Sequence, residues 1–126
     1  MGDNNIIVTR KSAAAITALQ LVKFTSAGKV TPCTVEGEKA DGIAQRAAAG
    51  ADEAVEVAVF GLTKAVAGAD LTEGGLVMVN TDGRLIDYSS AAGKYSVGRW
   101  LPNVNHTTTA NGEEVFILFT GASEFA

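Results

Sequence analysis

Hydrophobic and polar residues alternate along most of this chain with the period of two that β-strands require. In the stretch 54–60 every second residue is valine, and in 114–120 Val115, Ile117 and Phe119 share one face. Glycine-containing turns separate runs of this kind, which predict nine short strands. They are expected near 20–25, 29–35, 42–46, 54–60, 63–66, 76–80, 84–88, 95–101 and 114–120.

The chain contains the same hairpin pattern twice, and the second copy is shifted by 55 positions from the first. The segment LVKFTSAGKVTP (21–32) aligns with LVMVNTDGRLID (76–87), and each turn ends in a glycine, where positive φ favours that residue. The likeness continues into the last strand of each copy. We therefore expect an all-β fold: one compact, barrel-like domain over residues 19–126, built from two similar halves that cover each other's apolar faces. The halves span approximately 19–61 and 74–121.

The last strands of the two halves carry apolar residues on one face in both cases, but they differ on the opposite face. The first carries Glu56 and Ala58 there, whereas the second carries Phe116 and Leu118. The second strand is therefore apolar on both sides, as a strand covered from both sides would be. Either the chain itself buries both sides, or a neighbouring subunit covers one of them.

Residues 1–18 lie outside this repeat and are expected to form an N-terminal arm. They contain a β-prone patch, two cations and an alanine run, for which propensity alone predicts a short helix capped by Ser12. One interpretation is an extended arm that adds a strand to another sheet, and the alternative is a frayed terminus without a role. The candidate contact residues of the arm are Asn5, Ile6, Ile7, Val8, Thr9, Arg10 and Lys11.

Trp100 is the only tryptophan and is followed closely by Pro102. A large aromatic residue of this kind belongs either to the core or, with the proline beside it, to an interface as an anchor. We therefore add Trp100 and Pro102 to the candidate contact residues.

Composition excludes several classes of partner. The net charge is −4 and no Lys/Arg cluster is present, which argues against nucleic acid. Cys33 is the only cysteine, so no intrachain disulfide is possible. The apolar runs are shorter than the roughly 18 residues of a membrane span, and the N-terminus lacks the pattern of a signal peptide. The sequence predicts a soluble chain, made in a cytoplasm, without a membrane partner.

The residues predict no catalytic, cofactor-binding or metal site. His106 is a lone histidine in a polar stretch, and Cys33 is expected to be a small buried hydrophobic residue. The pairs Asp52-Glu53 and Glu113-Glu114 occupy equivalent places in the two halves, which indicates a structural use. We expect that the protein is not an enzyme.

Lys29 lies at the tip of the first hairpin, where a carrier domain would hold a modified lysine. A small ligand-binding or carrier β domain is therefore an alternative. The second hairpin carries Arg84 at the matching position, which shows that a cation there needs no modification.

Several motifs in fixed order resemble the small capsid decoration (cement) proteins of tailed bacteriophages. They are the run DGIAQRAAAGADEAVEVAVFG, the turn LTEGGLVMV, the tetrapeptide DGRL and the late strand SVGR. The resemblance covers roughly residues 19–121. It rests on the order and spacing of these motifs, because each glycine-spaced valine strand is common by itself.

The resemblance implies a β-tulip fold and homotrimers that bind the major capsid protein on the outer surface of an icosahedral head. The protein would then be made in the host cytoplasm, become part of the virion and stabilise the shell by bridging its subunits. The resemblance assigns residues 1–17 to contact with the shell or with a neighbouring subunit, and it supplies no catalytic residues. Another virion part, such as a head-fibre base or a tail-associated β domain, is the first alternative.

Overall fold

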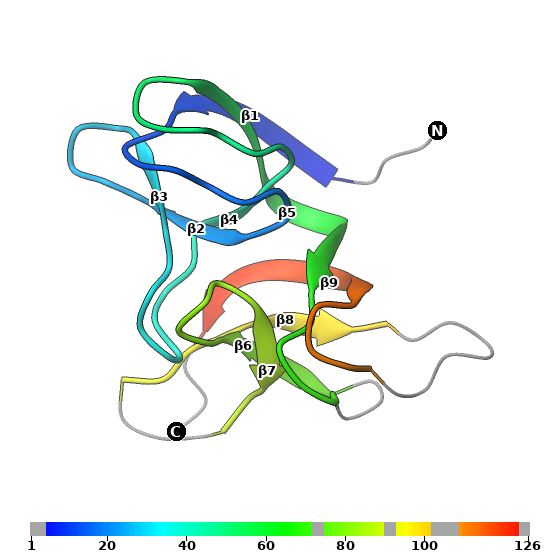
Figure 1. Ribbon diagram of the computed structural model, residues 1–126. Helices are drawn as coiled ribbons and strands as arrows, with labels where there is room; N and C mark the ends of the chain where they lie inside the picture. The colour runs from blue at the N-terminus through cyan, green and yellow to red at the C-terminus, as the bar shows by residue number, and fades with distance from the viewer. Residues whose placement is uncertain (1–4, 72–74, 90–92, 102–108, 124–126) are drawn as a thin grey trace.

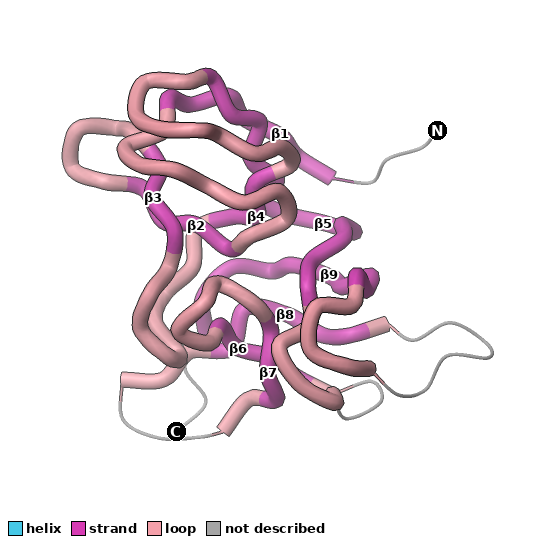
Figure 2. The backbone as a smooth tube through the Cα atoms, in the orientation of Figure 1, coloured by secondary structure: helices cyan, strands magenta, loops and turns pink. Residues whose placement is uncertain are grey.

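The computed structural model describes residues 5–71, 75–89, 93–101 and 109–123 (Figure 1). Its elements are the strands β1 (Asn5–Lys11), β2 (Leu21–Phe24), β3 (Val30–Pro32), β4 (Gly42–Ala44), β5 (Ala54–Val66), β6 (Leu76–Val79), β7 (Leu85–Asp87), β8 (Ser96–Trp100) and β9 (Glu114–Ser123). The described part of the chain contains no helix (Figure 2), and hence none long and apolar enough to cross a membrane. The expectation of an all-β, barrel-like domain is confirmed.

All strands join one antiparallel sheet in the order β3-β2-β4-β5-β9-β8-β6-β7, and β1 pairs with β5 off this path. The sheet bends so strongly that its two halves lie one above the other in Figure 1. The bend is at β5, where Gly61 pairs with both β1 and β9. The expected strands 54–60 and 63–66 therefore form one strand of 13 residues, because Gly61, with φ of 109°, turns the chain without ending the ladder.

The structural repeat begins at β1, earlier than the sequence similarity indicates. The isolated bridge between Ser12 and Val30 recurs 55 residues later between Ala67 and Leu85. The N–H groups of Ser12 and Ala67 also donate to equivalent carbonyl groups at the start of the last strand of each copy, both over 2.8 Å. β1 therefore corresponds to the second half of β5: β1 pairs with the first half of β5, and the second half of β5 pairs with β9 in the same way. The first copy comprises β1, β2, β3, β4 and the first half of β5. The second copy comprises the second half of β5 and β6, β7, β8 and β9.

Two expectations for the N-terminal region are wrong. Residues 5–11 are not an arm outside the repeat, because they form a seven-residue strand in register with β5. Residues 13–19 form turns and bridges in place of a helix. An alanine run favours a helix only weakly. Here the buried Ser12 hydroxyl bonds to the turn before β5, and Ile16 is buried in the core, so tertiary contacts override the local preference.

Each copy encloses an apolar core. The core of the first copy consists of small side chains, chiefly Val22, Val30, Val55 and Val57. The core of the second copy contains the equivalent residues Val77, Leu85, Val115 and Ile117. It also takes in Leu21 and Ile43, which point away from the core of the first copy. Around Leu21 and Ile43 the sheet of the first copy is thus covered on both faces.

Candidate interaction surface

The sheet of the second copy has one exposed face in the described structure. Alternation along β9 directs Val115, Ile117 and Phe119 into the core and leaves Phe116 39% exposed on the other side. The described part of the chain therefore does not bury both sides of this strand. We call the exposed side the outer face. Its large apolar residues are Ile6, Phe60, Leu62, Leu76, Leu101, Phe116 and Leu118.

The register of the strands makes the outer face continuous. Leu62 of β5 lies opposite Leu118 of β9. Leu118 lies opposite Arg99 of β8, which in turn lies opposite Leu76 of β6. Directly opposed residues of antiparallel strands point to the same side, with Cβ atoms about 5 Å apart. These side chains form a band across four strands, and Ile6 of β1 extends it beyond β5.

The outer face is large for an exposed apolar surface. Apart from the half-buried Leu118, its residues are 36 to 57% exposed. They present on the order of 500 Å² of apolar area, near the upper end of the patches that monomers expose. Its cations are the exposed Arg99 and Lys64, whose ammonium lies 5.5 Å from the centre of the Phe116 ring. An apolar surface with few charges is typical of the centre of a protein–protein contact.

The predicted contact residues of the arm are spread around β1. Ile6 belongs to the outer face. Asn5 and Val8 are half-buried: Asn5 Nδ2 donates to Leu62 O over 3.0 Å, and Val8 packs against the core of the first copy. The exposed members of the set are Ile6, Ile7, Thr9, Arg10 and Lys11.

Trp100 lies in the core, so the structure does not offer it as an interface anchor. It is 1% exposed, because alternation along β8 directs Arg99 outward and Trp100 inward. Pro102 and His106 lie outside the described residues. The outer face instead includes Leu101, the neighbour of Trp100, at 37% exposure.

Phe60, Leu62 and Leu76 were not among the predicted contact residues, although they lie on the outer face. A signal for the first two was available. Phe60, Leu62 and Lys64 stand two residues apart, so alternation places them on one side of β5. The lysine marks that side as the one facing solvent.

Titratable groups of the described residues make structural contacts. Cys33 is fully buried, as expected, and burial raises the pKa of its thiol to about 12, so the thiol stays protonated. Glu53 and Glu113 each accept a bond from a backbone N–H group of the preceding turn, from Ala49 N and Ala110 N respectively, both over 3.1 Å. The described ranges hold no group of three or more His, Cys, Asp or Glu side chains that could bind a metal ion.

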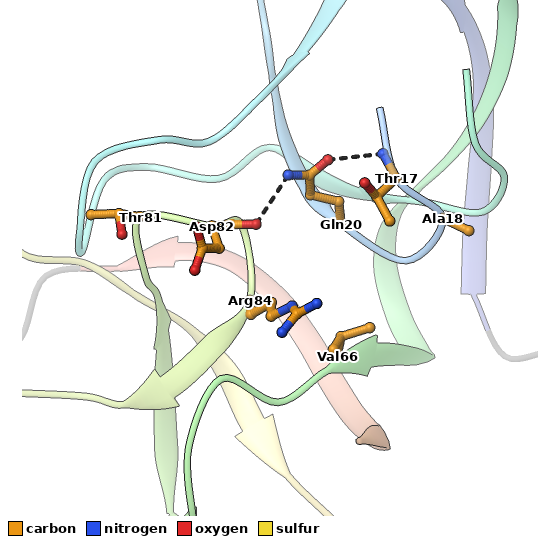
Figure 3. A pocket seen from close by; sticks show the side chains of 7 residues that line it. All are labelled: Thr17, Ala18, Gln20, Val66, Thr81, Asp82 and Arg84. Carbon is orange, nitrogen blue, oxygen red and sulfur yellow. Dashed lines mark hydrogen bonds between the residues drawn. The ribbon is translucent and has the colours of Figure 1, made fainter. Parts of the chain in front are cut away.

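The two copies meet around the turn of the second hairpin. Gln20 Nε2 donates to Asp82 O and Gln20 Oε1 accepts from Thr17 N, both over 3.0 Å (Figure 3). Beside them Leu21 N donates to Gly83 O over 2.9 Å. These bonds tie the start of β2 to the second hairpin, and we call this region the junction.

The loop between β3 and β4 completes the junction on the side of β6. Gly37 N donates to Val79 O, and Tyr95 N donates to Gly37 O, both over 2.8 Å. Lys94 and Glu36 form an ion pair of 2.7 Å across the same contact. The first copy therefore reaches the second through backbone bonds as well as apolar packing.

A pocket of about 510 Å³ opens at the junction. Its walls include Thr17, Gln20, Val66, Asp82 and Arg84, and Figure 3 shows the Arg84 guanidinium extended beside Val66. Arg84 Nη1 donates to Asn111 Oδ1 over 2.7 Å. Most of these side chains offer hydrogen bonds, which distinguishes the pocket from the apolar outer face.

Comparison with known proteins establishes the fold. No protein-family model matches the chain, and no curated protein sequence matches it. Among solved structures, the chain is similar to the head fiber gp8.5 N base in bacteriophage phi29, with a TM-score of 0.72 and 14% sequence identity. The match covers 95% of this chain and 98% of that chain. The fold and the surface together define a small β domain with one exposed apolar sheet face.

Proposed function

We propose that this chain is a structural protein of a bacteriophage head, which decorates the outer surface of the shell and stabilises it. The similarity to a phage head fiber base over nearly the full length of both chains carries this proposal. The outer face supports it, because a protein that bridges shell subunits needs apolar contact area. The proposed partners are the major capsid protein and further copies of this chain, in a homotrimer.

Attachment by this route depends on repetition. A single small contact binds weakly, but several contacts held in one rigid trimer act together and raise the overall affinity. In the described residues β1 pairs on one side only, with β5, and carries the exposed cations Arg10 and Lys11. Its free edge can accept a further strand, which makes β1 the proposed shell contact.

A head-fibre base is the second candidate, and the identity of the structural neighbour favours it. Such a base also sits on a phage head and needs contact area in place of a reaction centre. We expect the two candidates to differ in number, with a fibre base present in fewer copies than a decoration protein.

The copy number in purified particles separates the two candidates. We expect a ratio to the most abundant shell protein near one to one, measured by quantitative mass spectrometry of intact heads. A few copies per particle would favour the fibre base. Absence from the particles would exclude both and leave the ligand-binding or carrier alternative.

A further inference from the structure

We propose that copies of this chain associate head to tail, and that the contact between chains repeats the junction between the two copies within a chain. The inference rests on the self-association proposed above and specifies the surfaces that perform it. The donor surface is the part of the outer face around Leu76, Arg99 and Leu118. The receiver surface is the side of the first copy around Phe24, Gly28 and Asp41.

The donor surface lies on the face of the second copy's sheet that corresponds to a buried face of the first copy's sheet. Within the chain, three neighbouring positions on β2, β4 and β5 face the second copy and are fully buried: Leu21, Ile43 and Ala58. The same register on β6, β8 and β9 places their equivalents side by side as Leu76, Arg99 and Leu118. Nothing in the described structure covers this second set as the second copy covers the first.

The receiver surface is also exposed, whereas the corresponding residues of the second copy are covered at the junction. Val79 of the second copy is fully buried at the junction, whereas its equivalent Phe24 is 37% exposed. A Cβ atom added at Gly83 would overlap the side chain of Gln20, but one added at Gly28 would meet no atom within 4 Å. The first hairpin turn therefore lies in open space where the second is held by the preceding copy.

A backbone bond of the junction also lacks its counterpart. Leu21 N donates to Gly83 O across the junction. The equivalent groups are Leu76 N and Gly28 O, and the described residues contain no such bond between them. In a head-to-tail contact, Leu76 N of one chain donates to Gly28 O of the next.

Charge complementarity favours a second copy of this chain as the occupant. Ile43 and Val97 belong to one apolar cluster at the junction. Their equivalents are Arg99 on the donor surface and Asp41 on the receiver surface, both exposed. Two apolar residues of the cluster at the junction thus correspond to residues of opposite charge on the donor and receiver surfaces. Opposite charges at these positions make a contact between two copies selective.

The size and symmetry of the contact fit an assembly of several chains. The donor surface supplies only part of the roughly 500 Å² of apolar area on the outer face, whereas a standard interface buries about 800 Å² of total surface per partner, so one such contact is small and an assembly with several contacts is favoured. Donor and receiver are different surfaces, so the contact is heterologous. Contacts of this type satisfy every copy when the rotation closes a ring, and a trimer is the smallest such ring above a dimer.

Three matched variants test the inference, and each places a glutamate at an exposed apolar position. Leu76→Glu disables the donor surface, and Phe24→Glu disables the receiver surface. Val35→Glu is the control, because Val35 is 58% exposed and belongs to neither surface. The mass of each purified, full-length protein is measured by analytical ultracentrifugation, and far-UV circular dichroism with thermal melts verifies that each variant is folded.

We expect wild type and Val35→Glu to form the same closed oligomer. Leu76→Glu and Phe24→Glu should each be monomeric at concentrations at least tenfold above the wild-type midpoint, since each places a carboxylate where the contact buries an apolar side chain, and a tenfold weaker association corresponds to about 1.4 kcal/mol. An equimolar mixture of the two should form one-to-one heterodimers, because each retains the surface that the other lacks.

Several results would overturn the inference. They are a monomeric wild type, assembly of Phe24→Glu as efficient as that of wild type, or a mixture that stays monomeric. A symmetric contact between two outer faces would give the second of these results. All measurements use the purified chain, so their failure leaves the copy number in phage particles, and with it the proposed capsid role, as a separate question.

Discussion

The two copies of the repeat share a backbone, and they differ in what covers them. The outward position that is Glu56 in the first copy, ion-paired with Arg46, is the exposed Phe116 in the second. At the hairpin tips, Lys29 pairs with Asp52 over 2.6 Å, whereas Arg84 bonds to the neutral amide of Asn111. The two copies therefore share their strand positions, whereas the residue type at each position depends on whether that position is exposed, paired or buried in its own copy.

The largest expected effect tests how differently the two cores are filled. Trp100 lies opposite Ile117 in the second copy, at the place where Ala44 lies opposite Val57 in the first. Trp100→Ala should lower the free energy of unfolding by about 3–5 kcal/mol, because it removes the largest buried side chain of that core. Urea unfolding followed by circular dichroism measures the change.

The exposed neighbour of Trp100 supplies the control. Leu101→Ala should change the stability of the folded chain by no more than about 0.5 kcal/mol. A cost below about 1 kcal/mol for Trp100→Ala would show that the second core does not depend on its aromatic residue. The contrast between the two cores would then be lost.

The strands were predictable from the sequence because each copy repeats both the period-two alternation and the glycine turns. Gly28 and Gly83 indeed have φ of 80° and 75°. The start of the repeat was missed because β1 and its equivalent, the second half of β5, make equivalent backbone bonds but have almost no residues in common. Extending the hairpin shift of 55 back to Ser12 and Ala67 would have found it.

The interaction surface was only partly predictable. Alternation marked Phe116 and Leu118 as apolar on a second side, and the structure supplied the cross-strand neighbours that join them to Leu62 and Leu76. Those neighbours depend on register, which two strands far apart in the sequence do not reveal. Trp100 could not be assigned to the core or to the surface from the sequence, because the type of a single residue does not determine which face of its strand it occupies.

A smaller effect tests the backbone that the copies share. A Cβ atom at Gly98 would overlap the carbonyl oxygen of Leu118, and one at Gly42 would lie 2.8 Å from the carbonyl oxygen of Ala58. Gly98→Ala and Gly42→Ala should therefore each destabilise the protein by about 2–3 kcal/mol, measured by thermal and urea unfolding.

Gly50 is the matched control for both glycine variants, since a Cβ atom there would meet nothing within 4 Å. Gly50→Ala should leave stability within about 0.5 kcal/mol of wild type. Similar losses at Gly42 and Gly98 would sharpen the comparison of the copies. A loss at one position alone would show that the two strand crossings are not equivalent in solution.

The smallest effect concerns a polar pair that only the first copy has. Lys23 Nζ donates to Glu38 Oε2 over 2.7 Å, whereas the residue equivalent to Lys23 in the second copy is the buried Met78. Burial by itself raises the pKa of the Glu38 carboxyl. The bond from Lys23 and those from the backbone N–H groups of Val35 and Thr34 outweigh it and lower the pKa below the ordinary 4.5.

Because the pKa of Glu38 is lower in the folded chain, its stabilisation is present above the ordinary carboxyl value and disappears as pH falls through the folded value. Glu38→Gln should therefore cost about 0.5–1 kcal/mol at pH 7, a modest amount because the partner Lys23 is partly exposed to solvent. Near pH 3 and below, the difference from wild type should shrink towards zero. Urea unfolding of both proteins at the two pH values measures it.

The variant Lys23→Met, which carries the residue of the second copy, should show the same weakened dependence on pH. A cost for Glu38→Gln that stays constant between pH 7 and pH 3 would show that the hydrogen-bonding shape of the side chain stabilises this loop and that its charge does not.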